Sequence, residues 1–270
     1  MVLVDGHVHM HECFDVPAVF DAAAANFAAA ARDLGATRPY DAVLCLVESE
    51  NEHFLDGVRT RRIGRVWRGR HGYWEAEESS EPETLLVRCG ATRLAVIAGR
   101  QLVTRERLEV LALGTTAQLP SGEPIEATLT AVRDAGAAAV LPWGVGKWLG
   151  ARGAVIARVL NDPKWRHVLL GDNGNRLQLG PDPAQLTAAR RAGRSVLPGS
   201  DPLPLAGQET RVGAYGFAVD IALDPLRPAA ALLAVLASGS PLIAFGRREQ
   251  LTRFVGNQLA LRLQSRPRRH

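Results

Sequence analysis

Short apolar runs alternate with longer amphipathic segments along much of the chain, and this alternation predicts strands and helices in turn. Residues 2–5 form a short apolar run that ends in Asp5, residues 14–34 form an alanine-rich helical segment that Gly35 ends, and residues 42–47 are apolar again. The later pattern predicts helices over 123–135, 151–160 and 183–192, with strands over 138–141, 168–170 and 195–197. Strands and helices that alternate in this way are typical of an α/β fold with a parallel sheet.

The middle of the chain follows a different pattern. Residues 59–113 lack a helical period and alternate as strands do, with strands expected over 63–67, 72–76, 85–89, 94–97 and 108–113. Turn signals at Arg68-Gly69 and Cys89-Gly90 favour hairpins. We therefore expect a single domain over 1–270 with a β-rich insertion at about 55–100, and a final helix over 247–264.

Composition narrows the class of protein. Hydrophobic residues make up 47% of the 270 positions and charged residues 22%, which is ordinary for a chain that folds. No apolar run approaches the ~20 residues of a membrane span, and no basic segment precedes the first apolar run, so we expect a cytoplasmic protein without a membrane partner. The three cysteines form no Cys-x-x-Cys pair, which argues against a disulfide framework or a structural zinc knuckle.

Two histidines follow the first predicted strand in the run Asp5-Gly6-His7-Val8-His9. Residues two apart in a strand face the same way, so both imidazoles can reach one cation. Zinc and iron bind imidazole readily, and a carboxylate commonly completes the set. By the same parity Asp5 could orient a ligating histidine from behind.

A second candidate lies at 197–202, where an apolar strand ends in a small turn that contains Asp201. The turn alone would be equally typical of a helix cap. Taken with His7 and His9, however, it favours a metal site, because functional residues of α/β barrels gather at the carboxyl ends of the strands.

The order of these motifs resembles the PHP (polymerase and histidinol phosphatase) family of metal-dependent phosphoesterases over most of the chain. Members typically open with Asp-x-His-x-His, as here, and close with Gly-Ser-Asp-Ala-His, which residues 199–203 resemble. Between them, residues 47–49, 96–101, 138–143 and 172–175 stand where the family has Thr-Asp-His, Gly-x-Glu, a strand ending in His-Pro, and Glu-x-x-Asn. The resemblance implies a distorted (β/α)7-type TIM-like barrel.

Several family ligands are absent from this chain. Ser49 and Trp143 replace histidines, Gln101 replaces a bridging glutamate, and Pro202 or Leu203 stands where the final histidine would be. The resemblance therefore implies one remaining metal position rather than a cluster. We expect one divalent ion (Zn, Mn or Fe) on His7, His9, Asp201 and Gln101.

The function that this site implies is metal-dependent hydrolysis of a small anionic substrate, phosphoesterase-like, through the metal and its bound water. Polar residues at or after other strand ends supply the remaining roles. Glu48 and Asp172 are candidates for the general base, and Lys147 and Asn173 for substrate binding.

Three alternatives stay open. A degenerate barrel could serve as a binding or scaffold module, which the missing ligands favour. An amidohydrolase-type barrel shares the His-x-His start but normally adds histidines that we do not find after the middle strands. Finally, the six arginines between Arg59 and Arg70, beside aromatic residues, suit single-stranded nucleic acid, although a solvated hairpin would look the same and is our expectation.

Overall fold

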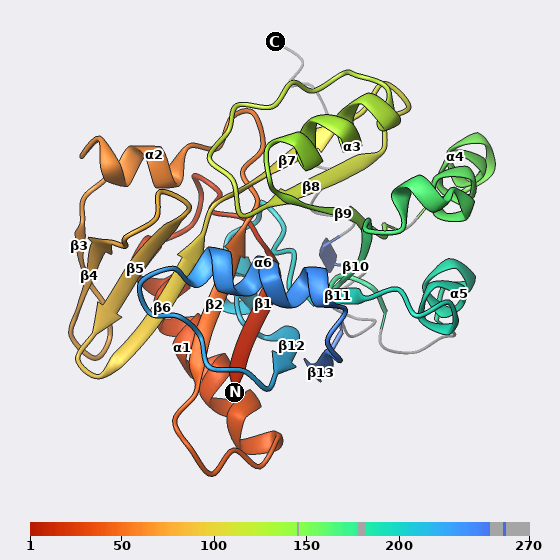
Figure 1. The fold of residues 1–270 in the computed structure, drawn as a ribbon. Helices are drawn as coiled ribbons and strands as arrows, with labels where there is room; N and C mark the ends of the chain where they lie inside the picture. The colour runs from red at the N-terminus through yellow and green to blue at the C-terminus, as the bar shows by residue number, and fades with distance from the viewer. Residues whose placement is uncertain (145, 178–181, 249–255, 258–270) are drawn as a thin grey trace.

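Two mixed sheets organise the protein (Figure 1). The computed structural model describes residues 1–144, 146–177, 182–248 and 256–257. The eight-stranded sheet has the order β13 (Ile243–Gly246), β12 (Tyr215–Val219), β1 (Val2–Val8), β2 (Asp41–Leu46), β6 (Thr92–Ile97), β5 (Thr84–Cys89), β4 (Tyr73–Glu78), β3 (Val66–Arg68). The five-stranded sheet has the order β11 (Val196–Gly199), β10 (Leu169–Asn173), β9 (Ala138–Pro142), β8 (Glu109–Leu113), β7 (Gly99–Val103).

Each sheet has a parallel part and an antiparallel part. The strands β1, β2 and β6 run parallel, as do β9, β10 and β11. Hairpins join β3 to β4, β5 to β6, and β7 to β8, so these pairs are antiparallel. The two turns predicted at Arg68-Gly69 and Cys89-Gly90 are confirmed, because each lies in one of these hairpins.

The expected TIM-like barrel is wrong: neither sheet closes on itself, and the two do not join into one ring within the described residues. A barrel needs a continuous, staggered ladder of strand pairs. Here β1 and β2, inner strands of the eight-stranded sheet, meet the edge strands β11 and β7 of the other sheet through isolated contacts. Examples are a bridge between Glu48 and Arg100 and a hydrogen bond from the Asp201 N–H to the His7 carbonyl. The hairpins between β3 and β8 also replace the helices that a repeating β/α barrel requires.

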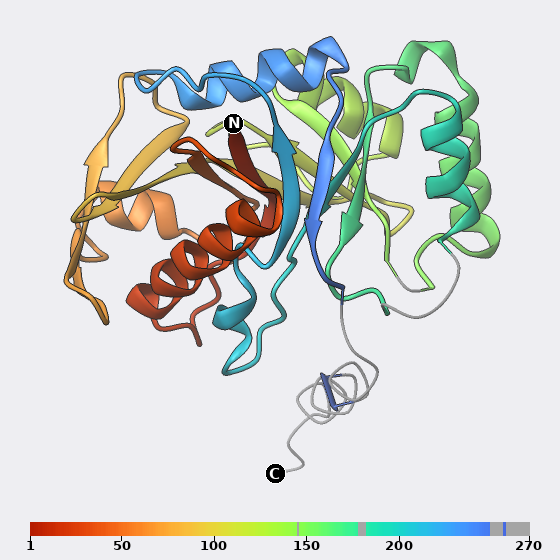
Figure 2. The same ribbon diagram turned by 90° about the horizontal axis from the view of Figure 1, so that it is seen from below.

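Helices cover the sheets and close the cores around them. Helix α1 (Val16–Asp33) packs Phe20 and Phe27 against the eight-stranded sheet, next to the short α2 (Phe54–Arg59). A second cluster contains residues of both sheets and Leu232 of α6 (Pro228–Ser238), which lies across one end of the molecule in Figure 2. Helices α3 (Ile125–Asp134), α4 (Gly150–Asn161) and α5 (Ala184–Arg191) pack on the five-stranded sheet.

Most predicted elements are confirmed within a few residues, including α1, α3, α4, α5 and the strands β1 to β6 and β8 to β11. The sequence reading did not identify α2, β7, β12, α6, β13 or the 3-10 turns η1 (Pro163–Trp165) and η2 (Gln208–Arg211). The helix expected over 247–264 falls almost entirely outside the described residues. In the part of the chain that the structure describes, no helix has both the length and the apolar character needed to cross a membrane.

Candidate metal centre

Strand β1 carries His7 directly against β11, because glycines stand where the two strands meet. A Cβ on Gly199 would lie 2.4 Å from the His7 backbone nitrogen, and one on Gly6 would lie 2.8 Å from the Pro198 carbonyl oxygen. Only glycine allows two backbones to approach so closely. The His7 carbonyl then accepts a 2.8 Å hydrogen bond from the Asp201 N–H, which joins the two sides of the site.

Buried Asp5 secures the same junction. Its carboxylate accepts hydrogen bonds from the backbone N–H groups of Ser200 and Gly213, both at 2.8 Å, and of His7 at 3.3 Å. Burial raises the pKa of Asp5 to about 6, although these hydrogen bonds oppose the change. The register of β1 shifts after Asp5, so simple alternation does not hold there. Asp5 therefore fixes the backbone around the site, whereas the sequence suggested that it would orient an imidazole ring.

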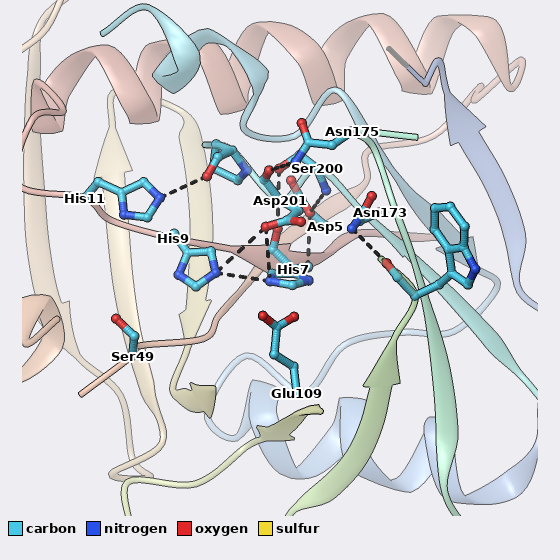
Figure 3. Close-up of polar contacts among 12 residues, drawn as sticks. Asp5, His7, His9, His11, Ser49, Glu109, Asn173, Asn175, Ser200 and Asp201 are labelled. Carbon is cyan, nitrogen blue, oxygen red and sulfur yellow. Dashed lines mark hydrogen bonds and ion pairs between the residues drawn. The ribbon is translucent and has the colours of Figure 1, made fainter. Parts of the chain in front are cut away.

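Three of the predicted ligands converge at this junction (Figure 3). The Nε2 atoms of His7 and His9 lie 3.1 Å apart, and Asp201 Oδ1 lies 3.4 Å from the first and 3.9 Å from the second. Ligands at about 2.0–2.1 Å from a tetrahedral ion stand about 3.3–3.4 Å from one another. The observed separations bracket this value, and the three residues form a group that could hold a metal ion.

The turn after β11 directs Asp201 toward the histidines. Its backbone has φ of +47°, a left-handed conformation that aspartate tolerates better than most residues. The Asn175 side chain donates a hydrogen bond to the Asp201 carbonyl and holds this turn from the loop after β10. Figure 3 shows the Asp201 carboxylate above the two imidazole rings.

A second group of polar side chains lies behind His9. The His9 Nδ1 atom is 2.9 Å from Glu52 Oε2, which also accepts hydrogen bonds from the N–H and the hydroxyl of Ser49, each at 2.9 Å. His11 Nδ1 lies 2.6 Å from Glu52 Oε1 in an ion pair that lacks the alignment of a hydrogen bond. His11 Nε2 lies 3.0 Å from the Pro202 carbonyl oxygen. His9, His11 and Glu52 are thus also close enough to form a possible metal-binding group.

Burial and neighbouring charges set the protonation of the site. Burial lowers the pKa of His7, which favours the neutral ring that a metal requires. Burial also acts on His9, but the hydrogen bond to Glu52 and the charge of Asp201 outweigh it and raise the pKa of that ring. Burial would raise the pKa of Asp201, but its interactions with the nearby imidazoles, with Lys147 and with Asn175 outweigh burial and lower that pKa. Contacts with His11 and His9 hold the pKa of Glu52 well below its usual range despite burial.

His9, His11, Glu52 and Asp201 line a cavity of about 590 Å³. Two further predicted residues, Gln101 and Lys147, line it, together with Glu109 of β8, whose carboxylate forms an ion pair with the Lys147 Nζ atom. In Figure 3 the Glu109 side chain points toward His7 from the opposite wall. The loops after β1, β2 and β11 form most of the remaining wall.

The structure does not bring the two predicted general bases to this cavity. Glu48 faces a separate cavity of about 390 Å³, where its carboxylate accepts a 3.0 Å hydrogen bond from the Leu55 N–H and lies 3.8 Å from Arg100. Asp172 is buried in a bidentate ion pair with Arg176, both contacts at 2.9 Å, and accepts a hydrogen bond from the Tyr215 hydroxyl.

The predicted substrate residue Asn173 is also engaged elsewhere, because its side-chain amide donates a 2.9 Å hydrogen bond to the Trp143 carbonyl. Sequence reasoning missed Glu52 and Glu109. Glu52 follows Ser49 by three residues, and Ser49 stands where the PHP pattern has a histidine. A carboxylate so close to a missing ligand was the signal that could have identified it. Glu109 is the first residue of a strand whose other four residues are apolar and buried, so nothing in the sequence indicated that its side chain lines a cavity.

The arginine-rich stretch occupies α2, β3 and the loops beside them. Arg59 and Arg65 both form ion pairs with Glu78, and Arg62 forms one with Asp56. Half of the six arginines thus have carboxylate partners on the surface of the protein itself.

No family model and no curated protein matches this chain. Its fold is similar to that in the crystal structure of PsfC from Pseudomonas syringae PB-5123, with 16% sequence identity and a TM-score of 0.50. The match covers 97% of this chain and 98% of that chain. At this identity the likeness concerns the fold alone, and it extends over nearly the whole length of both proteins.

Proposed function

We propose that this protein binds one divalent metal ion through His7, His9 and Asp201 and hydrolyses a small anionic substrate, phosphoesterase-like, in the adjoining cavity. The observation that carries the proposal is the convergence of two imidazole nitrogens and one carboxylate oxygen within 3.1–3.9 Å at a cavity wall. The first and last motifs of the PHP resemblance, which contain His7, His9 and Asp201, support the same conclusion, whereas the barrel that the resemblance implied is not found.

The donor set suits zinc, iron or manganese, since imidazole and carboxylate bind all three. A metal with three protein ligands and an open position lowers the pKa of a water molecule that it binds toward about 7. Gln101 lines the same cavity and is available as a neutral fourth ligand. The second candidate group shares His9 with the first, so the two groups do not add up to two independent positions.

Two side chains at the cavity would bind the substrate and accept a proton. Lys147 supplies a positive charge at the cavity wall for an anionic group of the substrate. Glu109 is the carboxylate that faces the histidines from across the cavity, and we assign to it the proton-accepting role that the sequence suggested for Glu48 or Asp172.

A binding or scaffold module is the second candidate. The observation that favours it is the hydroxyl of Ser49, which donates to Glu52 and occupies the place of a histidine in the PHP pattern. A site that keeps one metal position could retain binding after losing turnover.

Metal analysis tests the first step. Protein purified without chelator should contain about one equivalent of zinc, manganese or iron, and the His7→Ala and Asp201→Ala variants should lose it. His71→Ala is the matched control, because His71 is an exposed histidine in the β3–β4 turn. A metal-free wild type that also fails to take up added zinc or manganese would overturn the proposal.

Turnover separates the enzyme from the scaffold. Hydrolysis of p-nitrophenyl phosphate and of bis(p-nitrophenyl) phosphate should require the metal and should fall at least 100-fold in Glu109→Gln, which keeps the metal. Full activity in Asp201→Ala would refute the site. Bound metal without turnover on any phosphoester or carboxylic ester would favour the scaffold.

A further inference from the structure

The carboxylate of Glu52 lies behind His9, on the side of the ring away from His7 and Asp201. One of its oxygens, Oε2, faces His9 Nδ1 at 2.9 Å and also accepts hydrogen bonds from the N–H and the hydroxyl of Ser49. Glu52 is buried, with 8% of its side chain exposed, so water competes little for these contacts. Glu52 therefore presents a fixed, charged acceptor to one nitrogen of a candidate ligand.

From this geometry we infer that Glu52 is a positioning residue of the metal centre, with Ser49 and His11 as its supports; the inference rests on the metal site proposed above. A carboxylate at Nδ1 keeps the proton on that nitrogen and leaves the Nε2 lone pair free for a metal. The Nε2 atom of His9 is the one that lies 3.1 Å from His7 Nε2 and nearest Asp201. Glu52 thus acts on the metal only through His9.

The same contacts argue against a second metal ion in the group His9, His11 and Glu52. A neutral imidazole has a single lone pair for coordination, and the geometry commits that of His9 to the side of His7 and Asp201. Glu52 Oε2 already faces three donors, and Oε1 lies 2.6 Å from His11 Nδ1, so a second cation would have to displace one of these contacts. The group is the outer support of one metal position.

His11 links this support to the other side of the site. Its Nδ1 atom pairs with Glu52 Oε1 at 2.6 Å, and its Nε2 atom contacts the carbonyl of Pro202 at 3.0 Å. Pro202 directly follows Asp201 in the chain. The contacts therefore form a closed path from His9 through Glu52 and His11 to the turn that carries Asp201, and they hold two of the three ligands in relation to each other.

The Glu52→Gln variant tests the inference. Glutamine keeps the size of the side chain but replaces the charged acceptor with a neutral oxygen and an N–H₂ group, which cannot accept from all the donors. The zinc dissociation constant, measured by competition with a chromogenic chelator, should rise about 10- to 100-fold. Glu50→Gln is the matched control, since Glu50 is exposed, lies two residues away and carries the same charge; its zinc affinity should stay within about 3-fold of the wild type.

Two further readouts separate positioning from a general loss of structure. The visible spectrum of the cobalt-substituted protein should change in Glu52→Gln, because the orientation of one ligand changes, while the melting temperature of the metal-free protein changes little. Should Glu52→Gln fail to fold, Ser49→Ala removes a single donor to Oε2, and a smaller rise in the dissociation constant is expected.

The outcomes are distinguishable. Wild-type zinc affinity and an unchanged cobalt spectrum in both variants would overturn the role of Glu52 and leave the metal site standing. Two metal ions per wild-type chain, one of them lost in Glu52→Gln, would overturn it in favour of a second metal position. No metal binding by the wild type would overturn the proposed function, and this inference with it.

Discussion

Replacing Gly199 with alanine should disrupt the proposed metal centre, although Gly199 is not one of its proposed ligands. The added Cβ would lie 2.4 Å from the His7 backbone nitrogen, 2.5 Å from its Cβ and 2.9 Å from its Cα. Packed carbon atoms prefer about 3.5–4.0 Å, so the contacts are short by about 1 Å and involve backbone that cannot rotate away. Strand β1 must therefore move relative to β11.

The expected cost follows from that movement. Overpacking of this kind destabilises a protein by about 1–3 kcal/mol, and urea denaturation of the metal-free protein should show a loss in this range. A shift near 1 Å also exceeds the tolerance of about 0.2 Å in metal–ligand distances, so the zinc dissociation constant should rise at least about 10-fold. Both effects have the same cause and should appear together.

Gly64→Ala provides the control. A Cβ there would meet its nearest neighbours, Trp67 Nε1 and the Val66 carbonyl oxygen, at 3.8 and 3.9 Å, which is ordinary contact. Stability should stay unchanged or rise slightly, because alanine restricts the unfolded chain, and zinc affinity should be unaffected. If Gly199→Ala behaved like this control, β1 and β11 could not abut as described.

Three other variants test the surroundings of the site. Protonation of Asp5 stabilises the wild type at low pH, because its pKa of about 6 in the folded protein exceeds the unfolded value of 3.8. The wild type should therefore lose about 3 kcal/mol of its free energy of unfolding as the pH rises from about 4 through 6. Urea titrations at each pH should show a flatter dependence in Asp5→Asn. Asp172→Ala removes the buried partner of Arg176, whose guanidinium keeps only its 2.9 Å ion pair with the partly exposed Asp182, and should cost about 1–3 kcal/mol in the same assay without changing metal content. Loss of metal with unchanged stability would contradict this structural role. The Glu81 carboxylate caps α6, because it accepts hydrogen bonds from the first N–H groups of that helix, including Ala230 at 3.1 Å. Glu81→Ala should lower the free energy of unfolding by about 1–2 kcal/mol. An unchanged denaturation midpoint would contradict the cap.

Local sequence patterns predicted the helices and strands, but not whether the sheets close into a barrel. The regular alternation that identifies α1 or β2 resides in adjacent residues, so it can be recognised without knowledge of the fold. Whether the two sheets join into a barrel depends on contacts between distant residues such as Glu48 and Arg100, which no local pattern encodes. Helix α6 was missed for another reason: its residues are apolar on nearly every side, so no helical period is visible.

The candidate ligands were easier to predict than the residues around them. His7, His9 and Asp201 belong to short motifs at strand ends, where chemistry is expected. Glu52 lies on a loop whose path depends on the rest of the fold. Glu48 shows the converse, because a carboxylate at the end of a strand can point to either side of the sheet, and this one faces a different cavity.

The candidate metal site lies at the seam between the two sheets, so its ligands come from both of them. His7 and His9 come from the strand β1 and the residue that follows it, while Asp201 follows β11 of the other sheet, and few backbone bonds join the sheets there. A metal ion on these three side chains, as proposed above, would cross-link the two sheets. By linkage, metal at 100 times its dissociation constant would add about 2.7 kcal/mol to the free energy of unfolding. Amide hydrogen exchange along β1 and β11 should slow on binding, so the seam itself reports the occupancy of the site.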